Sequence, residues 1–78
     1  MYKILGKRKL DFTADDGRHI VGTTIWYGME SDSVEGYQVE KAFISPDVMA
    51  YKEIPLNETV EISFNFKGRI QSIDVVIL

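Results

Sequence analysis

The sequence has no cysteine, a single histidine, His19, and only two prolines among its 78 residues. Without cysteine the chain can build neither a disulfide framework nor a thiolate metal site, so a reducing compartment is acceptable. One histidine, without metal-ligand spacing or a glycine-rich phosphate loop, offers few groups for catalysis. The sequence therefore indicates a protein that is not an enzyme and that needs neither a metal nor a cofactor.

Long hydrophobic runs are also missing. No stretch approaches the roughly 20 apolar residues of a membrane-spanning helix. The charges of Lys3 and of Lys7-Arg8-Lys9 interrupt the first apolar residues too early for a signal peptide. We therefore expect one cytoplasmic domain over residues 1–78, with a core so small that a homodimer would help to stabilise it.

Positive charge is scarce, because nine Lys and Arg residues stand against twelve Asp and Glu residues, for a formal net charge of −3. This balance argues against a nucleic-acid partner, since phosphate binding depends on clustered cations. The distribution is uneven, however: residues 1–27 carry five basic and three acidic residues, whereas residues 28–58 carry two and seven. The run Lys7-Arg8-Lys9 fits a phosphate-binding strand as well as a solvated edge strand.

Hydrophobic alternation and turn residues predict five strands and one short helix. The strands are expected over residues 2–13, 18–27, 37–44, 59–66 and 69–78, with a helix of two turns at most within 45–55. Ser45, Pro46 and Pro55 supply its start and stop signals. Asp15-Asp16-Gly17 and Lys67-Gly68 are typical of hairpin turns, and the polar residues 28–36 of a loop. Gly6 predicts a bulge in the first strand.

Three strands, a short helix and a closing hairpin form the element order of the OB-fold, a five-stranded Greek-key barrel. We expect this all-β, OB-like barrel, with the helix between the third and fourth strands. A small SH3-like barrel is the main alternative, because it has a similar number of strands.

Alternation also predicts which side chains fill the core. In the first strand Ile4, Leu10 and Phe12 are expected inside, and Lys7 and Lys9 outside. In the fourth strand the expected core residues are Val60, Ile62, Phe64 and Phe66. The sequence thus predicts a first strand that is basic on its outer side.

The aromatic residues offer a candidate binding surface. Trp26 and Tyr27 are neighbours on a strand and must point to opposite faces, so one is expected outside. A bulge in the third strand would leave Tyr37 and Lys41 outside while Phe43 packs inside. Exposed rings can stack on unpaired bases, at about 1–3 kcal/mol per base. The candidate nucleic-acid-binding residues are Lys7, Arg8, Lys9, Arg18, Trp26, Tyr27, Tyr37, Lys41 and Arg69.

The other polar residues have simpler interpretations. His19 follows a turn and is expected to be a solvent-exposed strand residue. Adjacent Asp15 and Asp16 before a glycine are turn chemistry. The acidic residues between Glu30 and Glu35 lack the length and glycine placement of a calcium-binding loop.

Three stretches carry a resemblance to a known family. They are Leu10-Asp11-Phe12-Thr13, Val39-Glu40-Lys41-Ala42-Phe43-Ile44-Ser45, and Thr59-Val60-Glu61-Ile62-Ser63-Phe64 followed by Lys67-Gly68-Arg69. As a pattern of apolar and turn positions, the chain resembles the small single-stranded-DNA-binding proteins of the filamentous-phage gene V type, and compact proteins encoded beside replication initiators on plasmids and conjugative elements of Gram-positive bacteria. The resemblance implies an OB-fold homodimer that coats single-stranded DNA without sequence preference during replication or transfer. The chain departs from that pattern between Glu30 and Glu35, where a basic, aromatic binding wing would be expected.

Two further hypotheses stay open. The chain could be an acidic protein-interaction module, an accessory or inhibitory protein of a mobile element, whose residues 28–58 contact a basic partner. It could also be a purely structural barrel subunit. The nucleic-acid hypothesis requires that exposed rings and the N-terminal basic residues share one face.

Overall fold

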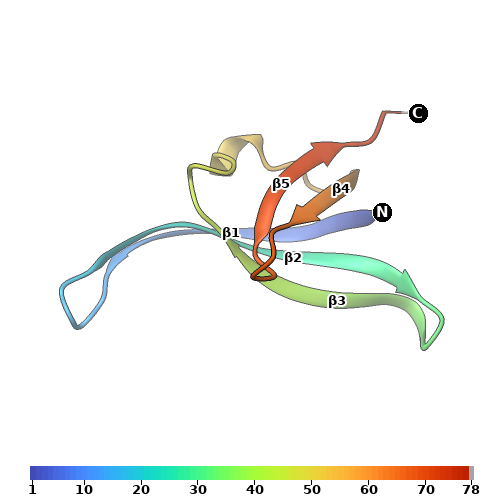
Figure 1. The fold of residues 1–78 in the computed structure, drawn as a ribbon, viewed down its shortest axis with the longest axis horizontal. Helices are drawn as coiled ribbons and strands as arrows, with labels where there is room; N and C mark the ends of the chain where they lie inside the picture. The colour runs from blue at the N-terminus through green and yellow to red at the C-terminus, as the bar shows by residue number, and fades with distance from the viewer. Residues whose placement is uncertain (78) are drawn as a thin grey trace.

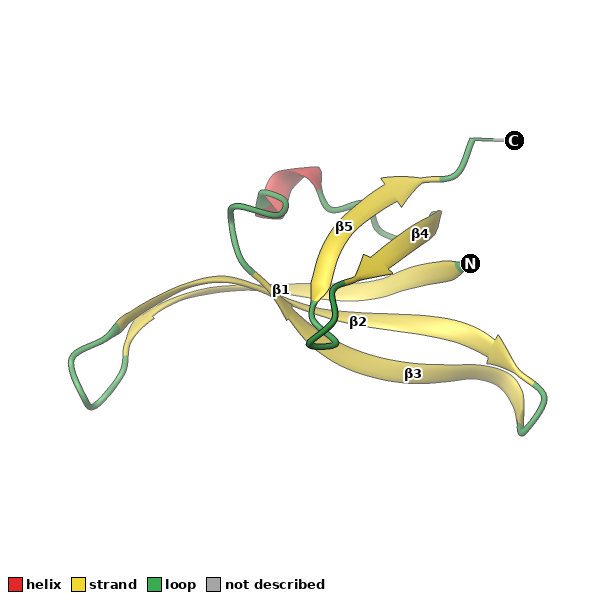
Figure 2. Cartoon of the chain, in the orientation of Figure 1, coloured by secondary structure: helices red, strands yellow, loops and turns green. Residues whose placement is uncertain are grey.

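The computed structural model describes residues 1–77, which form one antiparallel sheet of five strands (Figures 1 and 2). The elements are β1 (Tyr2–Thr13), β2 (His19–Ser31), β3 (Val34–Ile44), a 3₁₀ turn η1 (Tyr51–Glu53), β4 (Thr59–Phe64) and β5 (Ile70–Val75). The strand order is β3-β2-β1-β4-β5. No ladder joins the edge strands β3 and β5 within residues 1–77, so the sheet is not closed. The all-β class and the five strands are confirmed.

Two hairpins extend from the body of the molecule. The β1–β2 hairpin reaches out as a long arm, and the β2–β3 hairpin leaves on the opposite side (Figure 1). The turn of the arm forms where the sequence predicts it: Gly17 has φ of 89° and its N–H donates to Ala14 O at 2.9 Å. The Asp16 carboxylate accepts hydrogen bonds from the backbone N–H and the Nε of Arg18, at 3.1 and 2.7 Å.

A bulge in β1 decides which side chains reach the core. Ile4 pairs with Tyr27 and Gly6 with Trp26, so Leu5 is an extra residue in the ladder. One extra residue reverses the alternation of everything that follows. The predicted bulge is therefore confirmed.

The effect of this bulge on the side chains that follow it in β1 was not predicted. Lys7 and Lys9 lie on the same face as Ile4, opposite Ile25 and Thr23, and the prediction that they point outward is wrong. Leu10 and Phe12 lie on the other face, and Phe12 is 47% exposed rather than buried.

The core is made mostly of isoleucine. Its buried hydrophobic residues are Ile4, Ile25, Tyr27, Ile44, Ile54, Val60, Ile62, Ile70 and Ile73. They come from all five strands and from the segment before β4, so the β4–β5 hairpin and residues 45–58 cover the inner face of β1–β2–β3 (Figure 2).

The prediction that Phe64 and Phe66 are core residues is wrong, because they are 40% and 95% exposed. The strand ends at Phe64, since the Asn65 side-chain oxygen accepts hydrogen bonds from the N–H groups of Lys67 and Arg69 at 2.9 and 3.1 Å. A wider turn therefore replaces the predicted two-residue connection, with Gly68 at φ of 79°. Leu78, the last residue of the predicted fifth strand, lies outside the described residues.

Residues 45–58 contain one 3₁₀ turn, where a helix of two turns at most was predicted. Ser45 O accepts hydrogen bonds from the N–H groups of Val48 and Met49, at 3.1 and 3.4 Å, and this first turn does not continue. The Lys7 ammonium donates to Tyr51 O at 2.8 Å and to Ile54 O at 3.0 Å, and lies 4.3 Å from the centre of the Tyr51 ring. Lys7 thus fastens η1 to the inner face of β1.

We expect Lys7→Met to lower the free energy of unfolding by about 1.5–3 kcal/mol, the range for hydrogen bonds made by a charged group. Methionine keeps the apolar stem but removes the ammonium donor from both carbonyl oxygens, so that Tyr51 O keeps only the Ile54 N–H at 3.3 Å. Urea denaturation measures the loss. Lys9→Met, at an exposed position on the same face, is the control and should stay within about 0.5 kcal/mol of the native chain. Equal stabilities of the two variants would contradict the fastening role.

Candidate nucleic-acid interface

The face of β1, β2 and β3 that points away from the core is here called the outer face. Residues paired across antiparallel strands lie on the same side of a sheet, so the register identifies its members. Successive rows of that register are Arg8, Thr24 and Phe43; Gly6, Trp26 and Lys41; Lys3, Gly28 and Val39; and Glu30 with Tyr37. Leu10, Phe12 and Ile20 continue the same face along the arm. The outer face is therefore largely apolar and aromatic, with three cations and one acid in these rows.

Aromatic rings of the outer face lie over glycines of the neighbouring strand. A methyl group added at Gly22 would overlap the Phe43 ring. One at Gly28 would lie 3.2 Å from Tyr37 Cβ, and one at Gly6 would lie 3.6 Å from Cε3 of Trp26. Each ring therefore occupies the space that a side chain at the glycine would fill, and is held close to the sheet.

These rings remain accessible. Tyr37 is 46% and Phe43 49% exposed, and Trp26 is half-buried. Trp26 and Tyr27 point to opposite faces as predicted, with Trp26 outside. Phe43 would have packed inside only if a bulge had interrupted the third strand. The register has no shift between Tyr37 and Phe43, so Phe43 shares the alternation of Tyr37 and Lys41 along β3 and lies beside them. That uninterrupted alternation was the signal that could have identified it.

Arg8 and Lys41, two of the predicted cationic residues, are exposed on the outer face, and Lys41 is the direct neighbour of Trp26 in the register. Arg69 directly precedes β5, where it lines a hollow of about 500 Å³ together with Lys41 and Phe43. The structure thus brings Arg8, Lys41 and Arg69 close to the rings of the outer face.

The other predicted site residues lie elsewhere. Lys7 binds the carbonyl oxygens of the η1 segment, and Lys9 lies on the inner face. Arg18 forms an ion pair with Asp16 at the tip of the arm, at 2.7 Å.

Tyr27 belongs to the core and is only 7% exposed, so its ring is not available for stacking. Its ring meets that of Tyr2 edge to face, at 5.5 Å between centroids. Burial raises the pKa of the Tyr27 hydroxyl, and the charge of Glu40 and the neighbouring Tyr2 raise it further.

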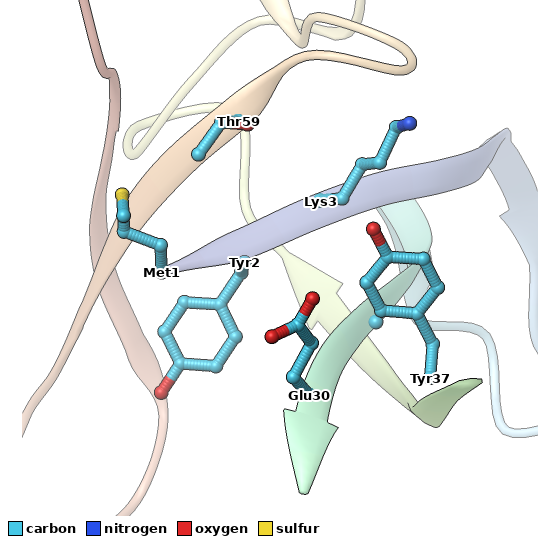
Figure 3. A pocket seen from close by; sticks show the side chains of 7 residues that line it. Met1, Tyr2, Lys3, Glu30, Tyr37 and Thr59 are labelled. Carbon is cyan, nitrogen blue, oxygen red and sulfur yellow. The ribbon is translucent and has the colours of Figure 1, made fainter. Parts of the chain in front are cut away.

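Besides Phe43, two charged residues of the outer face were not among the predicted site residues. Lys3 and Glu30 line a pocket of about 330 Å³ at the end of β1–β2–β3, together with Tyr2, Gly28, Tyr37 and Thr59 (Figure 3). Glu30 was interpreted as part of a loop, but β2 continues through it and pairs it with Tyr37.

The remaining polar groups form no comparable site. His19 Nε2 lies 2.8 Å from Asp11 Oδ1, and its Nδ1 lies 3.3 Å from Thr13 Oγ1, all exposed on the arm. Within residues 1–77 no group of three His, Asp or Glu side chains could hold a metal ion. In the same residues no helix has the length and apolar character to cross a membrane.

Comparison of the chain with family models, with curated proteins and with solved structures gives no match. The resemblance to gene V-type proteins therefore stays a prediction, and the outer face has to be interpreted from its own chemistry.

We expect Gly22→Ala to lower the free energy of unfolding by about 1–3 kcal/mol, because the methyl group collides with the Phe43 ring and with Ile44 O. Gly6→Ala is the matched control: its methyl group makes an ordinary contact with Trp26, so the change should stay within about 0.5 kcal/mol. Urea denaturation of both variants measures the difference. A Gly22→Ala variant as stable as Gly6→Ala would show that Phe43 does not rest on Gly22.

Proposed function

We propose that the chain binds single-stranded DNA on its outer face, largely without sequence preference. The observation that carries this proposal is the register of β1, β2 and β3, which brings Trp26, Tyr37 and Phe43 onto the same face as Arg8 and Lys41. Aromatic rings stack on bases of any sequence, and adjacent cations contact the phosphates.

Unpaired strands suit this face better than a duplex does. In a duplex the faces of the bases are stacked on each other, so exposed rings gain nothing from them, whereas an unpaired strand presents every base for stacking. The rings of Tyr37 and Phe43 are also fixed by the sheet beneath them, at Gly28 and Gly22, so little side-chain entropy is lost on binding.

The proposal extends to a partly open OB-like barrel. The edge strands β3 and β5 approach each other at the hollow lined by Lys41, Phe43, Arg69 and Ile70. Pairing between these two edges would turn the sheet into a five-stranded ring, the architecture in which many single-strand-binding proteins bind their ligand. The setting that we propose, cytoplasmic replication or transfer of a phage, plasmid or conjugative element by a homodimer, rests on the resemblance alone.

Few cations are available, so the salt dependence of binding should be shallow. Lys3, Arg8, Lys41 and Arg69 could neutralise about four phosphates, and each contributes about −0.7 to the slope of log K against log salt. We expect fluorescence anisotropy with a labelled oligothymidylate to give a slope between about −2 and −3. Stacking should also quench the emission of Trp26.

Lys41→Ala should weaken this binding severalfold and make the slope shallower by about 0.7, because one phosphate contact is lost. Lys9→Ala, which removes the same charge from the inner face, is the control and should change neither quantity. No anisotropy change at tens of micromolar protein in low salt would reject the proposal and favour the acidic protein-interaction module.

Phe43→Leu should lower the affinity for the oligonucleotide by about 1 kcal/mol or more, because leucine keeps the apolar contact with the sheet but offers no ring for stacking. Phe66→Leu, in the β4–β5 turn and almost fully exposed, is the control. Titrations of both variants at one salt concentration measure the effect. If Phe43→Leu binds as tightly as the native chain, the ring does not stack on a base.

A further inference from the structure

The pocket at the end of the outer face combines an aromatic ring, an acidic side chain and a basic side chain. Its lining includes Tyr37, Glu30 and Lys3, from β3, β2 and β1. Figure 3 shows the Glu30 carboxylate in the space between the rings of Tyr2 and Tyr37. The volume of about 330 Å³ lies within the range of small-molecule sites, about 300–1,000 Å³.

The pocket lies beside a glycine of β2, Gly28. Gly28 stands between Lys3 and Val39 in the register and lines the pocket. A methyl group there would come within 3.1 Å of Leu5 Cδ1 and 3.2 Å of Tyr37 Cβ, so the glycine lets Tyr37, which lines the pocket, lie close to the sheet. The position of this pocket wall therefore depends on the absence of a side chain at residue 28.

Glu30 is the unexpected group in a surface that is proposed to bind a polyanion. It is exposed, and no ion pair satisfies it within residues 1–77. A carboxylate repels phosphate, so it can favour binding only by accepting hydrogen bonds from a base.

The hydrogen-bonding groups of the four nucleobases determine which of them can donate to the Glu30 carboxylate. On its Watson–Crick edge guanine has two adjacent donors, N1–H and the 2-amino group, which match the two oxygens of a carboxylate. In adenine and cytosine a ring nitrogen acceptor stands beside the single amino group, and in thymine carbonyl oxygens flank the N–H. A carboxylate is repelled by these acceptors.

We propose that this pocket binds one guanine base of the bound strand, an inference that rests on the proposed function. Tyr37 stacks on the base, Glu30 accepts hydrogen bonds from its N1–H and 2-amino groups, and Lys3 contacts a neighbouring phosphate. The rest of the outer face remains tolerant of sequence. Glu30 is therefore the specificity-determining residue of the interface.

The test uses competition for binding of the whole chain between short oligothymidylates that differ at one central position. The strand with one deoxyguanosine should bind at least about fivefold more tightly than the all-thymidine strand, the lower end expected for a bidentate base contact. Deoxyinosine lacks the 2-amino group and should lose most of this gain. Deoxyadenosine and deoxycytidine should give none.

Glu30→Gln should remove the preference for guanine and leave binding of the all-thymidine strand equal or stronger, because a negative charge is lost. A merely structural role for Glu30 would weaken both strands alike. Glu35→Gln is the matched control, since Glu35 is an exposed acid near the start of β3 that does not line the pocket. It should retain the preference.

The outcomes separate this inference from the proposed function. Binding of every strand with equal affinity would overturn the guanine site and leave single-strand binding standing. A guanine preference that survives in Glu30→Gln would overturn the role of Glu30. If no strand binds at all, both proposals fall together.

Discussion

The extra residue at Leu5 is the feature on which the rest of the structure depends. Before it, Ile4 faces the core; after it, Lys7 and Lys9 face the same side, and Arg8 faces the other. In a regular strand the alternation would send Arg8 into the core and both lysines out of it. The bulge therefore supplies an ammonium group to fasten residues 45–58 to the sheet, and a guanidinium group to the surface that carries the rings.

Apolar side chains are divided between the two faces by size. The buried cluster consists of isoleucines and Val60, with Tyr27 as its one aromatic residue. The larger rings of Trp26, Tyr37 and Phe43 are left on the opposite face, where glycines make room for them. Exposed apolar side chains rimmed by polar residues are a common feature of interaction sites.

Local signals in the sequence predicted much of the fold. The strands, the bulge near Gly6 and the Asp16-Gly17 turn depend on residues close in the chain, and they were predicted. The faces of Lys7 and Lys9 were not, because they depend on which residue the ladder skips, and only the partner strand decides that. In the same way alternation placed Trp26 and Tyr27 on opposite faces, but pairing with Ile4 put Tyr27 in the core. The Asn65 side chain, which ends β4 early, competes with the ladder in a manner that alternation does not reveal.

The net charge of −3 is compatible with a polyanionic ligand because the charges are segregated. Glu30 is the one acid in the rows that hold the rings, against the three cations Lys3, Arg8 and Lys41. Asp32 lies in the β2–β3 turn, and Asp47, Glu53 and Glu58 lie in residues 45–58. At an ionic strength of about 0.1 M, charges more than about 10 Å away are largely screened, whereas cations in contact with phosphate are not. Stacking depends little on charge at all. A surface that relies on rings, with a few cations beside them, is therefore compatible with the proposed single-strand binding in a protein that is acidic overall.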